Sequence, residues 1–332
     1  MTGSMETNTT EETNTNEDFY TTMPNILRVS YMVVLSVISL LGIAGNSLVI
    51  WFVAFKMKKT VNSVWFSSLA FADFTFCLLL PLLVSYVALG SHWPFGTFIC
   101  KLGLFAAYLN MCASVLQLTV ISIDRCISVV FPVWCQNHRT VRLAMKVALA
   151  VWIVSILLNI PYLINTHADD SDENVVTCYK EYSMQRAQVI IRFIVLFVIP
   201  FTIIIFCYTV IFLRIQRNRR LTSTKPFKVI AAVIISFFIC WLPGHVFSLL
   251  RSYGSDTWNH NFRLVIYIGQ LLSTLLAFSN SCVNPLLYVF IGKDLKEKFW
   301  IAIKSAFERA FTEDTNLTDP KRGRSLPDHA IS

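Results

Sequence analysis

The stretch CKLGLFAAYLNMCASVLQLTVISIDRCISVV, residues 100–130, decides the fold. A helix rises about 1.5 Å per residue, so the part from Cys100 to Arg125 would extend roughly 37 Å, enough to cross a lipid bilayer. Such a helix carries a thiol at one membrane face and the adjacent Asp124 and Arg125 at the other. Hydrocarbon cannot satisfy its interior polar groups, so other helices must surround it. These interior groups are Asn110, Ser114 and Gln117.

The composition of the whole chain supports the same interpretation. Of its 332 residues 55% are hydrophobic and 14% are charged, whereas a soluble domain has about 25% charged residues. Residues 1–25 lack the apolar core of a cleavable signal, so we expect the first span to act as the insertion signal. The predicted fold class is an all-α membrane protein, a seven-transmembrane helix bundle. The seven apolar segments are about 29–55, 62–88, 97–130, 142–164, 187–213, 227–251 and 264–290.

The basic residues gather in alternate connecting segments. Most of the 28 Lys and Arg follow spans one, three, five and seven, and Arg139 and Arg142 are among them. By the positive-inside rule these segments are cytoplasmic and the amino terminus is outside, which predicts a multi-pass protein of the plasma membrane. The net charge of +8 is then a topology signal, and no nucleic-acid partner is expected.

Three further segments flank the membrane domain, residues 29–291. Residues 1–28 form a polar, acidic tail that is expected to be disordered and extracellular, with a glycosylation acceptor at Asn8. Residues 292–311 alternate basic and apolar side chains, which predicts a short amphipathic helix in contact with membrane lipid. Residues 312–332 are expected to form a disordered cytoplasmic tail.

The cysteines predict one disulfide. Of nine cysteines, five fall within spans and two face the reducing cytoplasm, so Cys100 and Cys178 remain as the outer pair. Their bond would tie the third span to the loop 165–186. That loop and the amino-terminal tail are rich in Asp and Glu. Such a surface attracts cationic ligands, or it is simply well hydrated.

A group of polar residues lies deep within the predicted spans. A carboxylate at that depth costs at least ~2.5 kcal/mol unless it has polar partners or an ion. We interpret Asp73 and its neighbours as a hydrated cluster able to hold a small cation; the alternative is an inert network between helices, which we favour for Asn46. No organic cofactor is expected. The cluster comprises Asp73, Asn110, Ser114, Asn280 and Asn284.

Prolines interrupt three of the later spans. Pro200, Pro243 and Pro285 each lack a backbone donor, which predicts a kink that can act as a hinge. Trp241 lies two residues before Pro243, and Asn284 directly precedes Pro285, where its amide can bond to a freed carbonyl. These combinations favour a bundle that changes shape.

Short motifs occur in order, about one per span. They are Gly45-Asn46, Leu69-Ala70-Phe71-Ala72-Asp73, Asp124-Arg125-Cys126, Trp152, Pro200 with Tyr208, Cys240-Trp241-Leu242-Pro243 and Asn284-Pro285-Leu286-Leu287-Tyr288. Over nearly the whole chain this set resembles the rhodopsin-like (class A) G-protein-coupled receptors. HWPFG at 92–96 and PVWCQNHRT at 132–140 resemble the chemoattractant branch, which includes the formyl peptide, chemerin and complement anaphylatoxin receptors.

The resemblance implies a receptor for an extracellular peptide, small protein or lipid that activates a heterotrimeric G protein, of the inhibitory class, and binds arrestin. Asp124 would hold Arg125 at rest and release it when the sixth span swings outward. Two tyrosines would then support Arg125, and a tryptophan would transmit ligand contact to a proline hinge. Asp73 and its neighbours would hold sodium in the inactive state. The other implied switch residues are Tyr208, Trp241, Pro243, Asn284, Pro285 and Tyr288.

The ligand pocket is expected in the outer half of the bundle. A cation in an apolar cavity favours a carboxylate ligand, and Arg192 matches a position used for anion contact in several relatives. For Arg251, extension of the side chain to the outer surface is an equal alternative. Tyr108 and Gln188 stand at two of the positions where formyl peptide receptors have an acid and an arginine, which disfavours formyl-methionine. The other expected lining residues are Tyr108, His245, Tyr267 and Gln270.

Other functions fit the sequence less well. It shows no inverted repeat of a transporter, no filter or charged ring of a channel, and its six histidines are scattered rather than gathered as in a metalloenzyme. The chain is therefore not expected to be an enzyme. Two alternatives remain: a decoy receptor that binds the same ligands without signalling, and a receptor for a lipid mediator.

Overall fold

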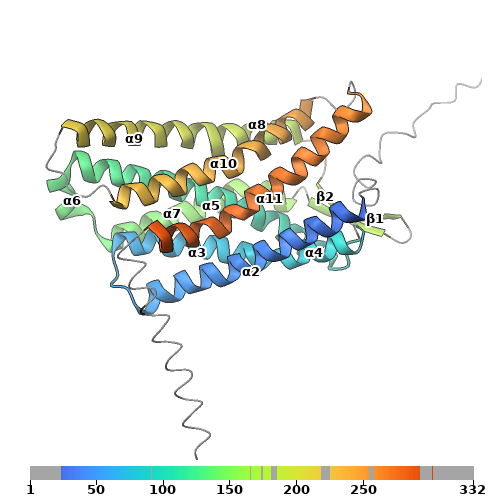
Figure 1. The fold of residues 1–332 in the computed structure, drawn as a ribbon, viewed down its shortest axis with the longest axis horizontal. Helices are drawn as coiled ribbons and strands as arrows, with labels where there is room; N and C mark the ends of the chain where they lie inside the picture. Colours follow the sequence, from blue (N-terminus) through green and yellow to red (C-terminus); the bar gives the residue numbers. More distant parts are fainter. Residues whose placement is uncertain are drawn as a thin grey trace, which may run out of the picture.

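The structure is a computed structural model and describes residues 24–90, 92–164, 166–172, 175–180, 185–217, 225–253, 258–291 and 301. Within these residues, seven helical segments are long and apolar enough to cross a membrane, and Figure 1 shows them side by side in one bundle. The predicted seven-helix fold class is therefore confirmed. The segments are α2 (Asn25–Phe55), α3 with α4 (Val61–Cys77, Leu80–Ala88), α5 (Gly96–Val130), α7 (Val141–Ile164), α8 with η2 and α9 (Gln185–Phe193, Ile194–Val198, Ile199–Arg217), α10 (Lys225–Tyr253) and α11 (His260–Ile291).

Helix α5 forms the centre of this bundle. It packs against α3, α7 and α9, and its buried residues run from Cys100 to Ser122. Around it lies the main apolar core, to which α3, α5 and α10 contribute large side chains. Among these are Trp65, Leu69, Val115, Leu118 and Phe237, each buried. The stretch that decides the fold is thus also the element against which the other helices are placed.

The two ends of the bundle differ in character. At one end, here called the disulfide end, Cys100 is bonded to Cys178. At the other, here called the arginine end, Asp124 and Arg125 lie beside the short helix α6 (Pro132–His138). Figure 1 shows α6 and the β-hairpin at opposite ends. The predicted placement of the thiol and the ion pair at opposite ends of one long helix agrees with this arrangement.

The segment after α7 contains a β-hairpin that the sequence did not predict. Strand β1 (Thr166–Asp172) pairs antiparallel with β2 (Val175–Lys180), with Ala168 opposite Cys178. The disulfide joins two residues 78 positions apart in the chain, so it anchors this hairpin to the start of α5. The hairpin therefore lies against the disulfide end rather than forming a free loop.

Two spans are less regular than the hydropathy suggests. The second is divided at Leu78 and Leu79, and α4 restarts with Pro81 in its first turn, where a missing N–H costs little. In the fifth, the π-helical turn η2 precedes Pro200, and the Ile199 N–H bonds to Ile194 O, five residues back. A proline cannot donate to the carbonyl four residues back, so the predicted irregularity at Pro200 takes the form of a π turn.

The boundaries differ modestly from those predicted. Helix α2 begins at Asn25, so the last residues of the expected tail 1–28 are helical. The predicted glycosylation site Asn8, the segment 312–332 and all of the segment 292–311 except residue 301 lie outside the described residues.

Candidate functional site

The middle of the bundle contains a layer of buried polar side chains. Asp73 on α3 has no exposed surface and accepts a 2.8 Å hydrogen bond at Oδ2 from Asn284 Nδ2 on α11. The amide of Asn110 on α5 lies 3.2 Å from Asp73 Oδ1 and 3.1 Å from Ser281 Oγ, so it donates to the carboxylate and accepts from the hydroxyl. Three helices that are distant in the sequence therefore meet at one carboxylate.

The remaining members of the predicted cation cluster lie in the same layer or beside it. Ser114 Oγ is 3.5 Å from the Asn110 amide, one turn along α5. Asn280 is buried on α11. Among the described residues, Asn280 Oδ1 and Asn284 Oδ1 are buried without a hydrogen-bond partner. Buried polar atoms normally have a partner, so this layer holds oxygen atoms that a small hydrated cation or water would satisfy.

Asn46 satisfies a carbonyl that a proline releases. Pro285 on α11 has no N–H for the carbonyl of Ser281, four residues earlier. Asn46 Nδ2 on α2 donates to that carbonyl at 2.9 Å, and also to Gly42 O at 2.9 Å. The two helices approach closely here, because a Cβ added to Gly45 would lie 3.0 Å from Pro285 Cβ. Asn46 thus has the structural role expected of it, whereas Asn284 bonds to Asp73 instead of a freed carbonyl.

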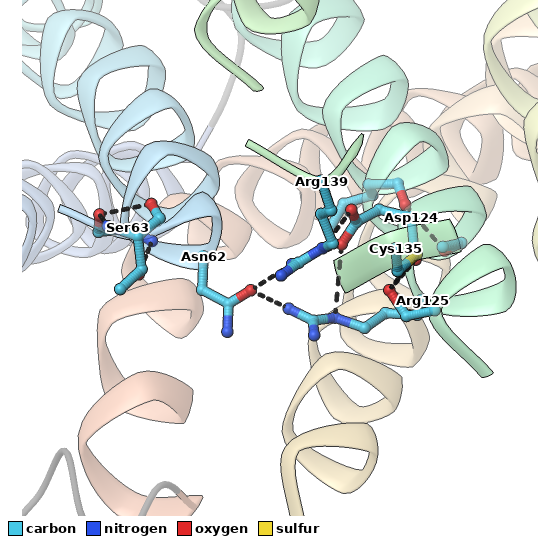
Figure 2. Close-up of polar contacts among 10 residues, drawn as sticks. Asn62, Ser63, Asp124, Arg125, Cys135 and Arg139 are labelled. Atoms are coloured by element: carbon cyan, nitrogen blue, oxygen red, sulfur yellow. Dashed lines mark hydrogen bonds and ion pairs between the residues drawn. The ribbon is translucent and has the colours of Figure 1, made fainter. Parts of the chain in front are cut away.

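At the arginine end, Asp124 contacts two arginines. Arg125 Nε is 3.9 Å from Asp124 Oδ2, a distance at which the two groups form a long ion pair. Closer contacts come from Arg139, whose Nε and Nη2 donate to the two carboxylate oxygens at 2.8 and 2.9 Å. Both arginines also donate to Asn62 Oδ1 on α3. Figure 2 shows the two guanidinium groups directed toward the Asn62 amide.

The ends of α3 and α5 place these groups. Thr60 caps α3 through a reciprocal pair of hydrogen bonds with Ser63, which sets Asn62 in the first turn. Phe131 precedes Pro132, and a residue before proline disfavours the helical region, so α5 ends and α6 begins there. The turn brings Arg139 back beside Asp124, which lies 15 positions earlier in the chain.

The other implied switch residues are on α9, α10 and α11. Trp241 packs on the apolar core with its ring 5.9 Å from Phe237, two residues before Pro243 within α10. Within the described part of the chain, the buried Tyr208 hydroxyl and Trp241 Nε1 have no hydrogen-bond partner. Tyr208 is therefore not bonded to Arg125 in this conformation. Tyr288 is on α11, but its side chain is outside the described residues.

In the half nearer the disulfide end, Arg192 forms the centre of one group of predicted ligand contacts. Its guanidinium lies over the Tyr108 ring, 4.9 Å from the centroid, which joins α8 to α5. The next residue, Phe193, is 5.7 Å from the ring of His245 on α10, and Phe197 is 5.2 Å from the same ring. His245 is buried. Three of the predicted residues thus gather where α5, α8 and α10 meet.

The other three predicted ligand residues form a second group, between α10 and α11. Arg251 is exposed near the end of α10, with its guanidinium 5.4 Å from the Tyr267 ring centroid. Gln270 Oε1 accepts a hydrogen bond from Ser248 Oγ at 3.4 Å. The exposure of Arg251 agrees with the alternative in which this side chain extends to the surface.

Several contacting residues were not among those predicted for the site. Asn62 and Arg139 surround Asp124, and Ser281 completes the layer around Asp73. Gln117 accepts from Ser68 Oγ at 3.2 Å, and Ser68 accepts from Trp152 Nε1 at 3.1 Å, which links α5, α3 and α7. The positive-inside rule groups Arg139 with the other basic residues, and the motif at 132–140 includes it, but neither signal predicts that it contacts Asp124.

The fold and these motifs agree with a known class of proteins. The family described as "7 transmembrane receptor (rhodopsin family)" matches residues 45–288, and the chain belongs to this family. It is a receptor family and not a family of enzymes.

Individual relatives define the branch. The chain is 42% identical to chemerin-like receptor 1 of Homo sapiens over 319 residues, covering 90% of this chain and 84% of that protein. It is 40% identical to the C3a anaphylatoxin chemotactic receptor of Danio rerio over 290 residues, covering 87% and 79%. It is 37% identical to N-formyl peptide receptor 2 of Homo sapiens over 316 residues, covering 90% of each. The predicted resemblance to class A chemoattractant receptors is confirmed.

Proposed function

We propose that this chain is a plasma-membrane receptor whose disulfide end faces outward and binds a chemerin-like peptide or small protein. Binding activates a heterotrimeric G protein of the inhibitory class at the arginine end, and arrestin binds there afterwards. The relatives with the higher identities are named chemerin-like receptors, and the distribution of Lys and Arg supports the proposed orientation.

The observation that carries this proposal is the arrangement around Arg192. Its guanidinium is half-buried against Tyr108, next to the aromatic contacts of Phe193 with His245. A guanidinium stacked on a ring still directs its N–H groups outward in its own plane, where they match the two oxygens of a carboxylate. The apolar surroundings reduce screening and strengthen that attraction. We infer that the ligand presents a carboxylate, such as a peptide carboxyl terminus, to Arg192.

Two residues disfavour a formylated peptide. Tyr108 and Gln188 stand where the formyl peptide receptors carry an acid and a second arginine, so Arg192 is the remaining member of that set. Tyr108 faces Arg192 with its ring and adds no charge. The site therefore suits a single anionic group.

We further propose that the layer around Asp73 binds sodium. The support is a buried carboxylate with neutral amide partners and the oxygens of Asn280 and Asn284, which have no hydrogen-bond partner among the described residues. Asp73, Asn110, Ser114, Asn280 and Asn284 would hold the ion. A bound cation supplies a positive charge beside a carboxylate that lies in the middle of the membrane. Occupancy would then favour whichever bundle shape keeps these side chains together.

The proposed function is tested with a synthetic peptide from the carboxyl terminus of chemerin, made as the free acid and as the carboxamide. Binding and inhibition of cyclic AMP formation are measured in cells that express the chain. We expect the free acid to be about tenfold or more stronger than the amide, and Arg192→Gln to remove that difference. Arg263→Gln is the matched control, because Arg263 is exposed on α11 at the disulfide end.

Three other outcomes of this experiment would each support a different conclusion. Binding of the peptide without G-protein activation would indicate the decoy receptor. A response to chemoattractant lipids alone would indicate the lipid-mediator receptor. An acid-to-amide difference that persists in Arg192→Gln would contradict the role of Arg192.

A further inference from the structure

Asp124 bonds more closely to Arg139 than to its neighbour in the sequence, Arg125. Arg139 engages both carboxylate oxygens, at 2.8 and 2.9 Å, whereas Arg125 approaches one of them at 3.9 Å. A two-pronged arginine–carboxylate contact is stronger and more directional than a single long one. The side chains of Asp124 and Arg139 are 13% and 25% exposed, so solvent screens their contact only in part.

Asn62 connects the two arginines. Its Oδ1 accepts from Arg139 Nη2 at 2.9 Å and from Arg125 Nη2. Two positive groups therefore share one carboxylate and one amide oxygen. Since the carboxylate already bonds Arg139 at both oxygens, Arg125 keeps its hydrogen bond to Asn62. Among the described residues, loss of the Arg139 charge would leave Arg125 as the one cation in contact with Asp124.

The backbone holds Arg139 in position from both sides. Its N–H closes α6 by bonding to Cys135 O at 3.0 Å, and Cys135 N–H bonds to Phe131 O at 3.1 Å. Thr140, which follows, caps α7 by accepting from Leu143 N–H at 3.2 Å. Arg139 thus lies between two hydrogen-bonded helix ends, so its approach to Asp124 costs less conformational entropy than that of a side chain on a free loop.

We propose that Arg139 is a positioning residue for G-protein activation: it competes with Arg125 for Asp124 and so keeps Arg125 directed to Asn62 and available. In this arrangement the ion pair between Arg139 and Asp124 connects the end of α6 to α5. Whether Arg125 bonds to Asn62 or to Asp124 then depends on whether α6 is packed against α5. The inference rests on the G-protein coupling proposed above.

The contact itself is tested on the purified full chain in lipid nanodiscs, without G protein. Hydrogen–deuterium exchange is measured for residues 131–141 in Arg139→Gln, Asp124→Asn and the double variant. We expect each single variant to exchange about fivefold faster, equivalent to about 1 kcal/mol, and the double variant no faster than either. Arg142→Gln, which removes the same charge from an exposed position three residues away, is expected to match the unmodified chain. Equal exchange in Arg139→Gln and Arg142→Gln would overturn the inference.

The consequence is tested by nucleotide exchange on an inhibitory-class heterotrimer, without agonist and with the free-acid chemerin peptide. Arg139→Gln is expected to lower the rate about fivefold, because Asp124 then captures Arg125. In the Asp124→Asn background the same substitution is expected to change nothing. An equal loss in both backgrounds would show that Arg139 acts elsewhere and would refute the competition. If the unmodified chain stimulates no exchange at all, the proposed coupling fails, while the deuterium measurement still decides the contact.

Discussion

Asp73 and Asp124 are carboxylates on two packed helices, α3 and α5, and they have opposite kinds of partner. Asp73 is fully buried, and the amides of Asn110 and Asn284 bond to it. Asp124 is partly exposed at the end of the bundle, and two arginines contact it. A guanidinium in mid-membrane would need its own compensation, whereas neutral amides can move with a helix at little electrostatic cost. The depth of a carboxylate therefore decides whether amides or cations accompany it.

The largest effect is expected from removing an amide at the buried carboxylate. Asn284→Leu leaves Asp73 Oδ2 without its 2.8 Å donor, and a buried carboxylate that loses a hydrogen bond costs about 3 kcal/mol. The free energy of unfolding is measured by SDS titration in mixed micelles. Ser279→Ala, which removes a neutral hydroxyl that donates to Leu276 O on the same helix, is expected to change it by less than about 0.5 kcal/mol. Equal values for the two variants would contradict the role given to the amide.

A smaller effect is expected from the cation. At sodium concentrations about ten times its dissociation constant, binding to the Asp73 layer adds about 1.4 kcal/mol to the stability of the unmodified chain. Asp73→Asn keeps the shape of the side chain and removes its charge, so this gain is expected to vanish. Thermal unfolding in sodium chloride is compared with unfolding in potassium chloride at equal ionic strength. A sodium gain that survives in Asp73→Asn would place the ion elsewhere.

The smallest effect on stability is expected at the arginine end. Asp124→Asn breaks a contact that is partly open to solvent and screened by salt, so the free energy of unfolding falls by about 1 kcal/mol or less. When the SDS titration is repeated at high salt, the difference in the free energy of unfolding between Asp124→Asn and the unmodified chain is expected to be smaller. A loss as large as that of Asn284→Leu would show that the two carboxylates are equivalent, and the comparison would then fail.

Hydropathy and charge predicted the seven spans and the bundle, because a helix that crosses a bilayer must be long and apolar along its own sequence. The cysteine distribution pointed to the pair Cys100 and Cys178, which the structure joins. The same local signals could not predict the hairpin, the division at Leu78 or the π turn. Those features depend on how each segment packs, and hydropathy is nearly unchanged by them.

For the site, the sequence identified which residues are too polar for their depth, among them Asp73, Asn110 and Asn284. It did not identify that Asn46 would bond to a carbonyl 235 residues away, or that Arg139 would displace Arg125 as the closer partner of Asp124. A sequence alone determines which groups need a partner, since that follows from their chemistry and the membrane around them. Only the tertiary structure decides which partner each one receives, because hydrogen bonds act over about 3 Å and that distance is set by how the helices cross.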